Sequence, residues 1–227
     1  MDVLARLDQT RAAVNVLEHP FYERWSAGQL SARELGVYAA EYRRAVIALA
    51  EASERAAAEA GATHAPGLRE HAEEETAHVK LWEEFARVTG ALAATPGDER
   101  TLPETEKCVE AWTAGEDLLE NLAVLYAIEA GQPEISRTKL EGLTAHYGYT
   151  EEGPAVEYFR VHELRDSEHA RQAHELIAEL IAQADDPEET ADRMVKRASA
   201  ALRGNWRLLD GVEAHAADQD GSEGLSA

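Results

Sequence analysis

The segment Tyr158–Ala170 carries two histidines and an aspartate at helical spacing. His162, Asp166 and His169 are separated by four and three residues, so a helix would place all three side chains on one face. Two imidazoles and a carboxylate placed in this way can converge on one metal ion. This donor set suits iron or manganese better than magnesium or calcium. The alternative interpretation is a solvated polar face whose side chains hydrogen-bond to one another.

A second group of candidate ligands lies upstream, on another predicted helix. Glu75 and His78 are three residues apart, and Glu74 and His78 are four apart, so either pair can share a helical face. Glu-x-x-His is the ligand pair that helical bundles supply to dimetal carboxylate sites. The alternative for the run Glu73–Glu75 is an acidic, solvated face.

Glu129 is a third candidate, because the surrounding stretch Leu122–Ala130 is otherwise almost wholly apolar. A lone buried carboxylate is costly unless it is paired or bound to a metal ion. The alternative is a hydrogen-bonded glutamate near a helix end, since Gly131 and Pro133 follow closely. Three separate segments that each offer ligands favour a metal site over coincidence.

The composition predicts an all-helical, cytoplasmic protein. The chain has 227 residues, which is enough for one large domain with a sizeable core. Valine and isoleucine never form alternating runs, so strands have little support. No apolar run reaches the length of a membrane span, and the first residues lack a signal-peptide core. The single cysteine, Cys108, excludes an internal disulfide and fits a reducing compartment.

The charge of the chain is strongly negative. It has 44 acidic and 22 basic residues, a formal net charge of −22. Such a surface repels nucleic acid and anionic lipid, so neither is expected as a partner. Adaptation to high salt, where ions screen the self-repulsion, is the favoured interpretation. The alternative is an ordinary acidic bacterial protein.

Helix signals predict the elements that must position these side chains. Ser31 and Glu34 form a capping-box pattern, and prolines and glycines mark most other boundaries. We therefore expect a single all-α bundle of seven to nine helices over residues 1–213, followed by an acidic, disordered tail at 214–227. A polar loop is expected at 91–102. The helices are expected at about 2–17, 31–60, 66–90, 103–114, 116–130, 133–147, 154–184 and 187–210.

Several stretches resemble one known fold family in consistent order. Leu17–Ser31 is similar to the N-terminal signature of the TenA/PqqC-like, haem-oxygenase-like fold, and Leu125–Glu129 and Lys139–Gly148 continue the likeness. His-x3-Asp-x2-His resembles the metal motif of the haem-oxygenase-like diiron oxidases, and in particular of the CADD-like group. The resemblance covers about residues 14–182. It implies a seven-helix bundle with two irons (or an iron/manganese pair) in its core, dioxygen as oxidant and an external reductant.

The resemblance also implies a ligand set. Where the CADD-like pattern has a further glutamate about two turns before His78, this chain has His71. Either His71 binds the metal, or Glu74 or Glu75 does so. Glu41, on the preceding helix, is a weaker candidate. The residues that match the other ligands of the family are His78, Glu129, His162, Asp166 and His169.

Two further matches concern the reaction. Tyr22 and Lys139 correspond to a tyrosine and a lysine that CADD-like proteins are thought to use in making p-aminobenzoate, the folate precursor, from their own side chains. On composition alone, Tyr22 would be a core aromatic and Lys139 a surface lysine. The favoured function is therefore a diiron oxygenase that consumes Tyr22, with Lys139 as amine donor or base.

Other functions remain open at this stage. The same metal centre could oxidise an external amino acid or fatty acid. A TenA-like thiamine or aminopyrimidine hydrolase would need a cysteine nucleophile, for which Cys108 is the only candidate. A cofactor-free PqqC-like oxidase would leave the ligand set unexplained, and the non-enzymatic alternative is an iron-binding or regulatory protein. The sequence does not determine the oligomeric state and is compatible with a homodimer.

Overall fold

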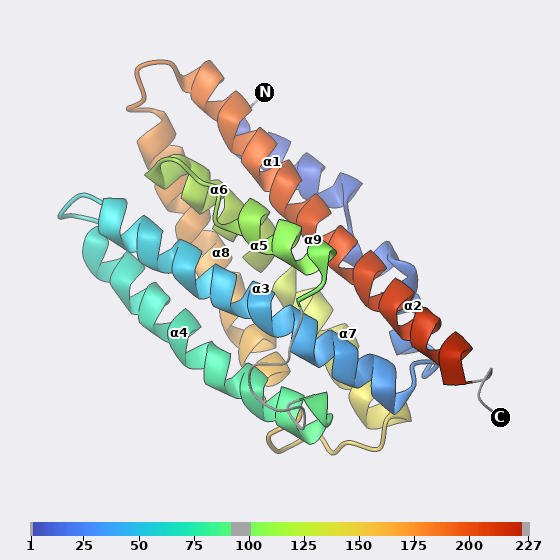
Figure 1. Ribbon diagram of the computed structural model, residues 1–227. Coiled ribbons are helices and arrows are strands. Elements are labelled where there is room, and N and C mark those ends of the chain that lie inside the picture. Colours follow the sequence, from blue (N-terminus) through green and yellow to red (C-terminus); the bar gives the residue numbers. More distant parts are fainter. Residues whose placement is uncertain (1, 92–100, 224–227) are drawn as a thin grey trace.

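The computed structural model describes residues 2–91 and 101–223, and every regular element within these ranges is helical. Nine α-helices and one short 3-10 helix occupy the described residues, in agreement with the predicted all-α bundle (Figure 1). The elements are α1 (Val3–Ala13), η1 (Val16–Glu18), α2 (Pro20–Ser26), α3 (Ala32–Glu59), α4 (Ala65–Val88), α5 (Pro103–Trp112), α6 (Leu118–Glu129), α7 (Gln132–His146), α8 (Glu157–Ile181) and α9 (Pro187–Glu223).

The predicted helix starts are largely confirmed. Ser31 and Glu34 form the capping box of α3, with the Glu34 N–H donating to Ser31 Oγ at 3.2 Å and the Ser31 N–H donating to Glu34 Oε2 at 2.7 Å. Pro20 opens the short helix α2, which lies between the helices predicted at 2–17 and 31–60. His19 caps this helix, because its Nδ1 accepts the N–H of Phe21 at 3.0 Å.

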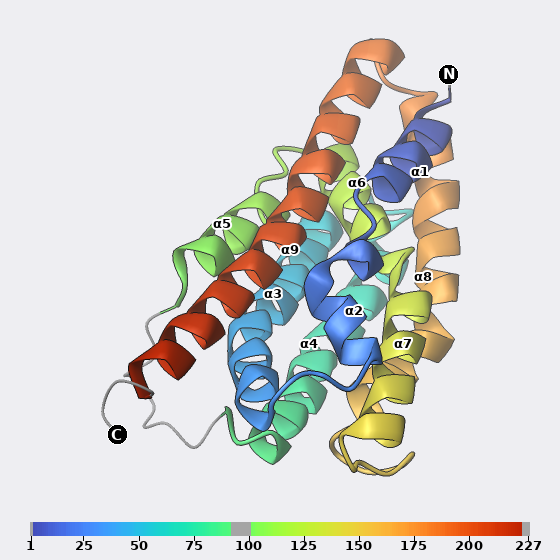
Figure 2. The ribbon, with the colours of Figure 1, turned by 90° about the vertical axis from the view of Figure 1, so that its right-hand side faces the viewer.

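Helix α6 lies at the centre of the bundle. It packs against α3, α8 and α9, and all its residues from 120 to 129 are buried (Figures 1 and 2). Its surroundings explain the apolar sequence of this segment, since no face of the helix meets water. The pairs α3–α4, α5–α9 and α7–α8 surround it.

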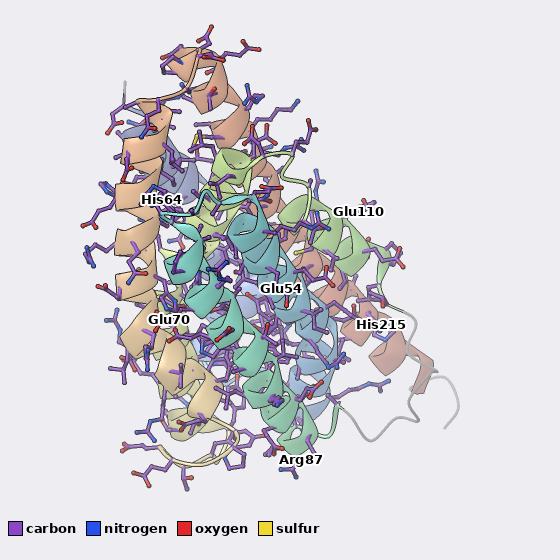
Figure 3. All side chains as sticks on the ribbon, turned by 90° about the vertical axis from the view of Figure 1, so that its left-hand side faces the viewer. Glu54, His64, Glu70, Arg87, Glu110 and His215 are labelled. Atoms are coloured by element: carbon purple, nitrogen blue, oxygen red, sulfur yellow. The ribbon has the colours of Figure 1, made fainter. Side chains whose placement is uncertain are left out.

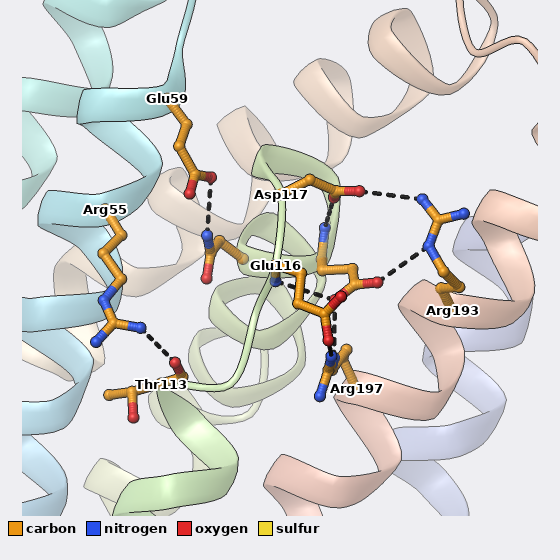
Figure 4. Close-up of polar contacts among 9 residues, drawn as sticks. Arg55, Glu59, Thr113, Glu116, Asp117, Arg193 and Arg197 are labelled. Carbon is orange, nitrogen blue, oxygen red and sulfur yellow. Dashed lines mark hydrogen bonds and ion pairs between the residues drawn. The ribbon is translucent and has the colours of Figure 1, made fainter.

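A network of arginines and carboxylates, the Glu120 cluster, fixes the start of α6 to α9 (Figure 4). The carboxylate of Glu120, whose side chain is only 2% exposed, accepts hydrogen bonds from Arg193 Nε at 3.0 Å and Arg197 Nε at 2.7 Å. Asp117 caps the helix through the N–H of Glu120 and also pairs with Arg193 at 3.0 Å. Each carboxylate in this cluster therefore has a cationic partner.

Helix α9 is longer than expected. It continues through residues 214–223, the greater part of the predicted tail, to Glu223. The cause is an apolar spacing that persists beyond residue 210, since Val212 and Ala216 are buried against the bundle. Residues 224–227 and most of the predicted loop at 91–102 lie outside the described residues.

Exposed carboxylates stand on several helices, as Glu54, Glu70 and Glu110 show in Figure 3. Among the described residues, no helix is both long enough and apolar enough to cross a membrane.

Candidate metal centre and aromatic chamber

Three helices bring the candidate ligands together in the core. Helix α8 packs against both α4 and α6, and Glu129 at the end of α6 meets His71 of α4. All of these side chains are buried or nearly so. They are His71, Glu75 and His78 on α4, Glu129 on α6, and His162, Asp166 and His169 on α8.

The side chains form two adjoining groups, which we call the metal cluster. In one group, ligand atoms of His71, Glu75 and His169 all lie within 4.8 Å of one another; in the other, those of Glu75, His78 and His162 do so. Glu75 belongs to both groups and is 1% exposed. One carboxylate is therefore placed where it could bridge two neighbouring cations.

Glu129 and Asp166 complete the first group. Glu129 Oε1 lies 3.0 Å from His71 Nε2, and Asp166 Oδ1 lies 3.8 Å from His169 Nδ1. Both carboxylates are almost fully buried. The predicted ligands from three separate helices thus occupy one site.

Hydrogen bonds orient two of the imidazoles. His162 Nδ1 donates to the carbonyl of Tyr158 at 2.7 Å, which leaves Nε2 as the lone-pair nitrogen. His169 Nε2 lies 2.9 Å from Glu74, so its Nδ1 is the lone-pair nitrogen. Donation from the opposite ring nitrogen is the arrangement that fixes metal-binding histidines in proteins.

The polar atoms of the cluster fit a metal ion. Buried polar atoms normally have hydrogen-bond partners, yet many here have none, and both lone-pair nitrogens described above are among them. Carboxylate oxygens and imidazole nitrogens are the donors that iron and manganese accept. The atoms without a hydrogen-bond partner are His71 Nε2, Glu75 Oε2, both Glu129 oxygens, His162 Nε2, both Asp166 oxygens and His169 Nδ1. The 3.0 Å contact between His71 Nε2 and Glu129 Oε1 brings opposite charges together without the alignment of a hydrogen bond.

The pKa shifts in the cluster also favour a metal ion at this site. Burial and the neighbouring carboxylates, Glu129 first among them, raise the pKa of Asp166 well above its usual range. Burial lowers the pKa of His71, but Glu129 and the adjacent glutamates outweigh it and raise the value to about 9. Burial lowers the pKa of His162 to about 4. The shifts of Asp166 and His71 therefore reflect several carboxylates crowded around both side chains, an environment that a divalent cation stabilises.

His71, Glu74 and Glu75, the alternative ligands in the sequence, have different positions in the structure. His71 and Glu75 are in the cluster, whereas Glu74 belongs to neither group and pairs with Arg165 at 3.0 Å as well as with His169. Glu41 is engaged elsewhere, because its carboxylate accepts the N–H of Leu102 at 3.1 Å.

Tyr22 and Lys139 meet in a second buried region, the aromatic chamber. Lys139 is 1% exposed, so the surface position that composition suggests is wrong. Its Nζ lies 5.5 Å from the ring centre of Tyr22. Trp25 holds the lysine backbone, because its indole N–H donates to the Lys139 carbonyl at 3.2 Å. The other rings around Nζ, at 4.9 to 5.7 Å, are Tyr38, Tyr42, Trp82 and Phe159.

Burial changes the acid–base behaviour of both residues. It lowers the pKa of Lys139 to about 7, so a large fraction of the amine is neutral near neutral pH. It raises the pKa of Tyr22, whose hydroxyl lies 3.4 Å from that of Tyr38. The chamber thus holds a protonated phenol beside an amine that readily loses its proton.

Ring contacts connect the chamber to the metal cluster. Tyr158 stacks on His162 with ring centres 4.0 Å apart, and it meets Trp82 edge-on at 4.8 Å. Trp82 contacts Tyr38 at 5.7 Å, and the hydroxyl of Tyr38 reaches that of Tyr22. Tyr158 and Trp82 were not predicted as parts of the site; the only signal was the four-residue spacing of Tyr158 and His162.

A pocket of about 310 Å³ opens on the other side of the metal cluster. His71 and His169 line it together with apolar side chains such as Leu68 and Leu125. His64 and Glu179, which also line it, form an ion pair at 3.2 Å.

Cys108 does not have the environment of a catalytic nucleophile. The thiol is fully buried, and burial raises its pKa far above the usual range. A catalytic cysteine needs the opposite environment, because the thiolate is the reactive form.

Comparisons with known proteins agree with this architecture. The sequence profile of a haem-oxygenase-like family described as iron-containing redox enzymes matches residues 70–206. The chain belongs to this family. It is 30% identical to the 4-aminobenzoate synthase of Nitrosomonas europaea over 91% of this chain and 89% of that protein. It is 29% identical to the 4-aminobenzoate synthase of Chlamydia trachomatis, over 92% and 91% of the two chains.

Solved structures show the same fold. A TenA homologue from Pseudomonas syringae superimposes with a TM-score of 0.79 over 93% of this chain and 91% of that one, at 16% identity. A domain with a heme oxygenase-like fold from Shewanella denitrificans gives a TM-score of 0.77 over 95% and 93% of the chains, at 19% identity. The predicted haem-oxygenase-like, TenA-like fold is thereby confirmed.

Proposed function

We propose that this protein makes 4-aminobenzoate from its own Tyr22, in an oxygen-dependent reaction that relies on metal ions in the cluster. The observation that carries the proposal is the position of Lys139 Nζ over the Tyr22 ring in a buried chamber. The likeness to 4-aminobenzoate synthases over most of the chain supports it.

The chemistry of the product fits these two side chains. 4-Aminobenzoate carries its amine and its carboxylate at opposite ends of one ring, and tyrosine carries its hydroxyl and Cβ in the same relation. The hydroxyl of Tyr22 must leave as water and be replaced by an amine nitrogen, for which Lys139 Nζ is the amine beside the ring; its bond to Cε would then have to break. The bond between Cα and Cβ of Tyr22 must also break, and Cβ must be oxidised to a carboxylate. Dioxygen and an external reductant would supply the oxygen atoms and the balance of electrons.

In this proposal the metal cluster holds two ions. Glu75 would bridge them, His78 and His162 would bind one, and His71 and His169 would bind the other together with Glu129 and Asp166. Iron, alone or paired with manganese, would supply dioxygen activation and one-electron oxidation when bound. Glu74 would hold His169 in the orientation that presents Nδ1.

The chain's own residues would then act on the substrate ring. Lys139, with its lowered pKa, can present a neutral amine to Tyr22. The contacts through Tyr158, Trp82 and Tyr38 give an electron a route from Tyr22 toward the cluster. The buried chamber excludes water, so an oxidised ring would be protected from side reactions.

The substitution Tyr22→Phe tests this function directly. The purified variant, given ferrous iron, reductant and oxygen, should make no 4-aminobenzoate, whereas Tyr126→Phe, which alters a tyrosine bonded to Asp8 on α1, should make as much as the parent. Mass spectrometry after turnover should find an altered mass on the peptide that contains residue 22 in the parent, and an unaltered one in Tyr22→Phe. Continued product formation by Tyr22→Phe would sink the proposal.

The pocket beside His71 and His169 favours a second candidate, oxidation of an external molecule at the same centre. Its apolar wall would suit a substrate with a hydrocarbon body. This candidate predicts that Tyr22→Phe keeps its oxygen consumption and that added substrate stimulates it.

A further inference from the structure

A second pocket, also of about 310 Å³, lies where the segment between α1 and α2 passes α7 and α9. Figure 2 shows this segment in front of the bundle, between the two helices. We call it the amide pocket, because three primary amides line it. Its lining includes Arg11, Asn15, Ile128, Gln132, Leu202 and Asn205.

Three polar atoms of the amide pocket are buried without a hydrogen-bond partner. They are Arg11 Nε, Gln132 Oε1 and Asn205 Oδ1. Gln132 is 3% and Asn205 5% exposed. A buried polar atom left unpaired is costly, so three in one pocket indicate a ligand. That ligand would need an acceptor for the guanidinium and a donor for the amide oxygens.

The charges around the pocket have both signs. Arg11 supplies a cation, and Glu18 and Glu134 supply anions. Ile128 and Leu202 provide apolar walls between these polar ends. A flat apolar molecule with a carboxylate at one end and an amine at the other matches this distribution.

A row of buried polar side chains leads from the aromatic chamber to the amide pocket. Gln132, Ser136 and Lys139 are spaced by four and three residues on α7 and therefore share a face. All three are buried, and Ser136 Oγ has no hydrogen-bond partner. Gln132 also touches the chamber, because its side chain hydrogen-bonds to Tyr42 and so opposes the rise in pKa that burial causes there.

We propose that the amide pocket binds the small aromatic amino acid that leaves the chamber, with Arg11 on its carboxylate and Gln132 and Asn205 on its amine. This inference rests on the proposed function, since the chamber is where 4-aminobenzoate would form. A free amino acid such as tyrosine has the same chemistry, so the test separates the two sources.

Calorimetric titration of the iron-loaded, full-length protein provides the test. 4-Aminobenzoate should bind at least tenfold more tightly than benzoate, aniline or L-tyrosine. Arg11→Gln should weaken 4-aminobenzoate and benzoate at least tenfold and spare aniline. Asn205→Leu should weaken 4-aminobenzoate and aniline and spare benzoate. Arg6→Gln, on the same helix but paired with Glu188 outside the pocket, is the matched control and should change nothing.

The outcomes separate this inference from the proposed function. Unchanged binding of 4-aminobenzoate in Arg11→Gln, whose partly exposed side chain makes folding failure unexpected, would overturn the inference. Tighter binding of L-tyrosine would overturn the assignment to the product. If the protein makes 4-aminobenzoate but none binds in the titration, the inference fails and the function stands. If the binding pattern holds but no product forms, the proposed function fails and the pocket is supported.

Discussion

Buried carboxylates occur in two clusters that are built in opposite ways. In the Glu120 cluster, Arg193 and Arg197 provide the charge that balances Glu120. In the metal cluster, the ion partners of Glu75 and Glu129 are histidines, which are charged only when protonated. The first cluster is complete within the chain, whereas the second needs a proton or a cation from outside.

The pKa values express this difference. Burial raises the pKa of Glu120, but Arg197 and then the other partners outweigh it, so the net shift is downward. The pKa of Asp166 is raised by burial and then further by Glu129 and other carboxylates. The charge of a buried carboxylate is thus balanced within the chain where arginine meets it, and it lacks that balance where only imidazoles and other carboxylates do. Replacing equivalent residues in the two clusters should therefore have different consequences.

The largest effect is expected from removing a ligand. Asp166→Ala or His162→Ala should lower bound iron and 4-aminobenzoate formation by at least about a hundredfold, because even the partners of metal ligands are worth about 10–100-fold. Helical content should survive, since most apolar packing is untouched. Elemental analysis, product assay and circular dichroism would measure the three quantities.

Glu120→Gln is the matched control for those variants. It should keep its iron and its activity at a temperature where it is folded, because Glu120 contacts arginines rather than the metal cluster. Full iron content in Asp166→Ala or His162→Ala would show that the ligand assignment is wrong.

Lys139 extends the comparison to a buried cation. Burial lowers its pKa from 10.5 to about 7, so the folded protein binds fewer protons than the unfolded chain between these two values. The contribution of Lys139 to the free energy of unfolding is therefore most favourable above pH 10.5. It falls as the pH drops toward 7, by at most about 5 kcal/mol. Lys139→Met should be more stable than the parent at pH 6, and the difference should shrink toward pH 10.

Denaturant unfolding at the two pH values measures this effect. Lys107→Met, at an exposed position, should leave the pH dependence as it is in the parent. A parent whose stability does not rise relative to Lys139→Met between pH 6 and pH 10 would contradict a buried amine with a lowered pKa.

The clustering of the candidate residues was largely predictable, because side chains three or four residues apart share a face of a helix. That spacing placed His162, Asp166 and His169 on one face of α8, and the apolar setting of Glu129 marked it as unusual. The different surroundings of Glu74 and Glu75 were not predictable, because both stand within reach of His78 along the helix. Glu75 lies in the metal cluster, whereas Glu74 pairs with Arg165 on another helix.

The aromatic chamber could not be predicted from the sequence, for a similar reason. Its rings come from α2, α3, α4 and α8 around a lysine on α7, and no local spacing connects them. The resemblance to CADD-like proteins was the only signal for Tyr22 and Lys139. The helices of the fold were easier to predict, since proline and capping-box signals are local. The last helix was extended by tertiary burial of Val212 and Ala216, against a composition typical of disorder.

A smaller effect is expected on the stability of the metal-free protein. Glu129→Gln removes one of several crowded negative charges, so it should stabilise the metal-free protein by about 1–3 kcal/mol. Glu120→Gln removes charged hydrogen bonds and should destabilise it by about 1–3 kcal/mol. Urea unfolding after chelation measures both, and shifts of the same sign would contradict the contrast between the clusters.

The smallest effect concerns salt. With a net charge of −22, mutual repulsion should destabilise the fold in dilute buffer, and molar potassium chloride should screen it and raise the melting temperature by several degrees. Salt also weakens the attraction between Glu120 and its partly exposed arginines, so this cluster opposes the gain. Glu120→Gln lacks that opposing part, and its melting temperature should rise by at least as much as the parent's. Thermal unfolding of the parent and the variant in both buffers separates the two contributions. An unchanged melting temperature in the parent would instead favour an ordinary acidic protein over one adapted to high salt.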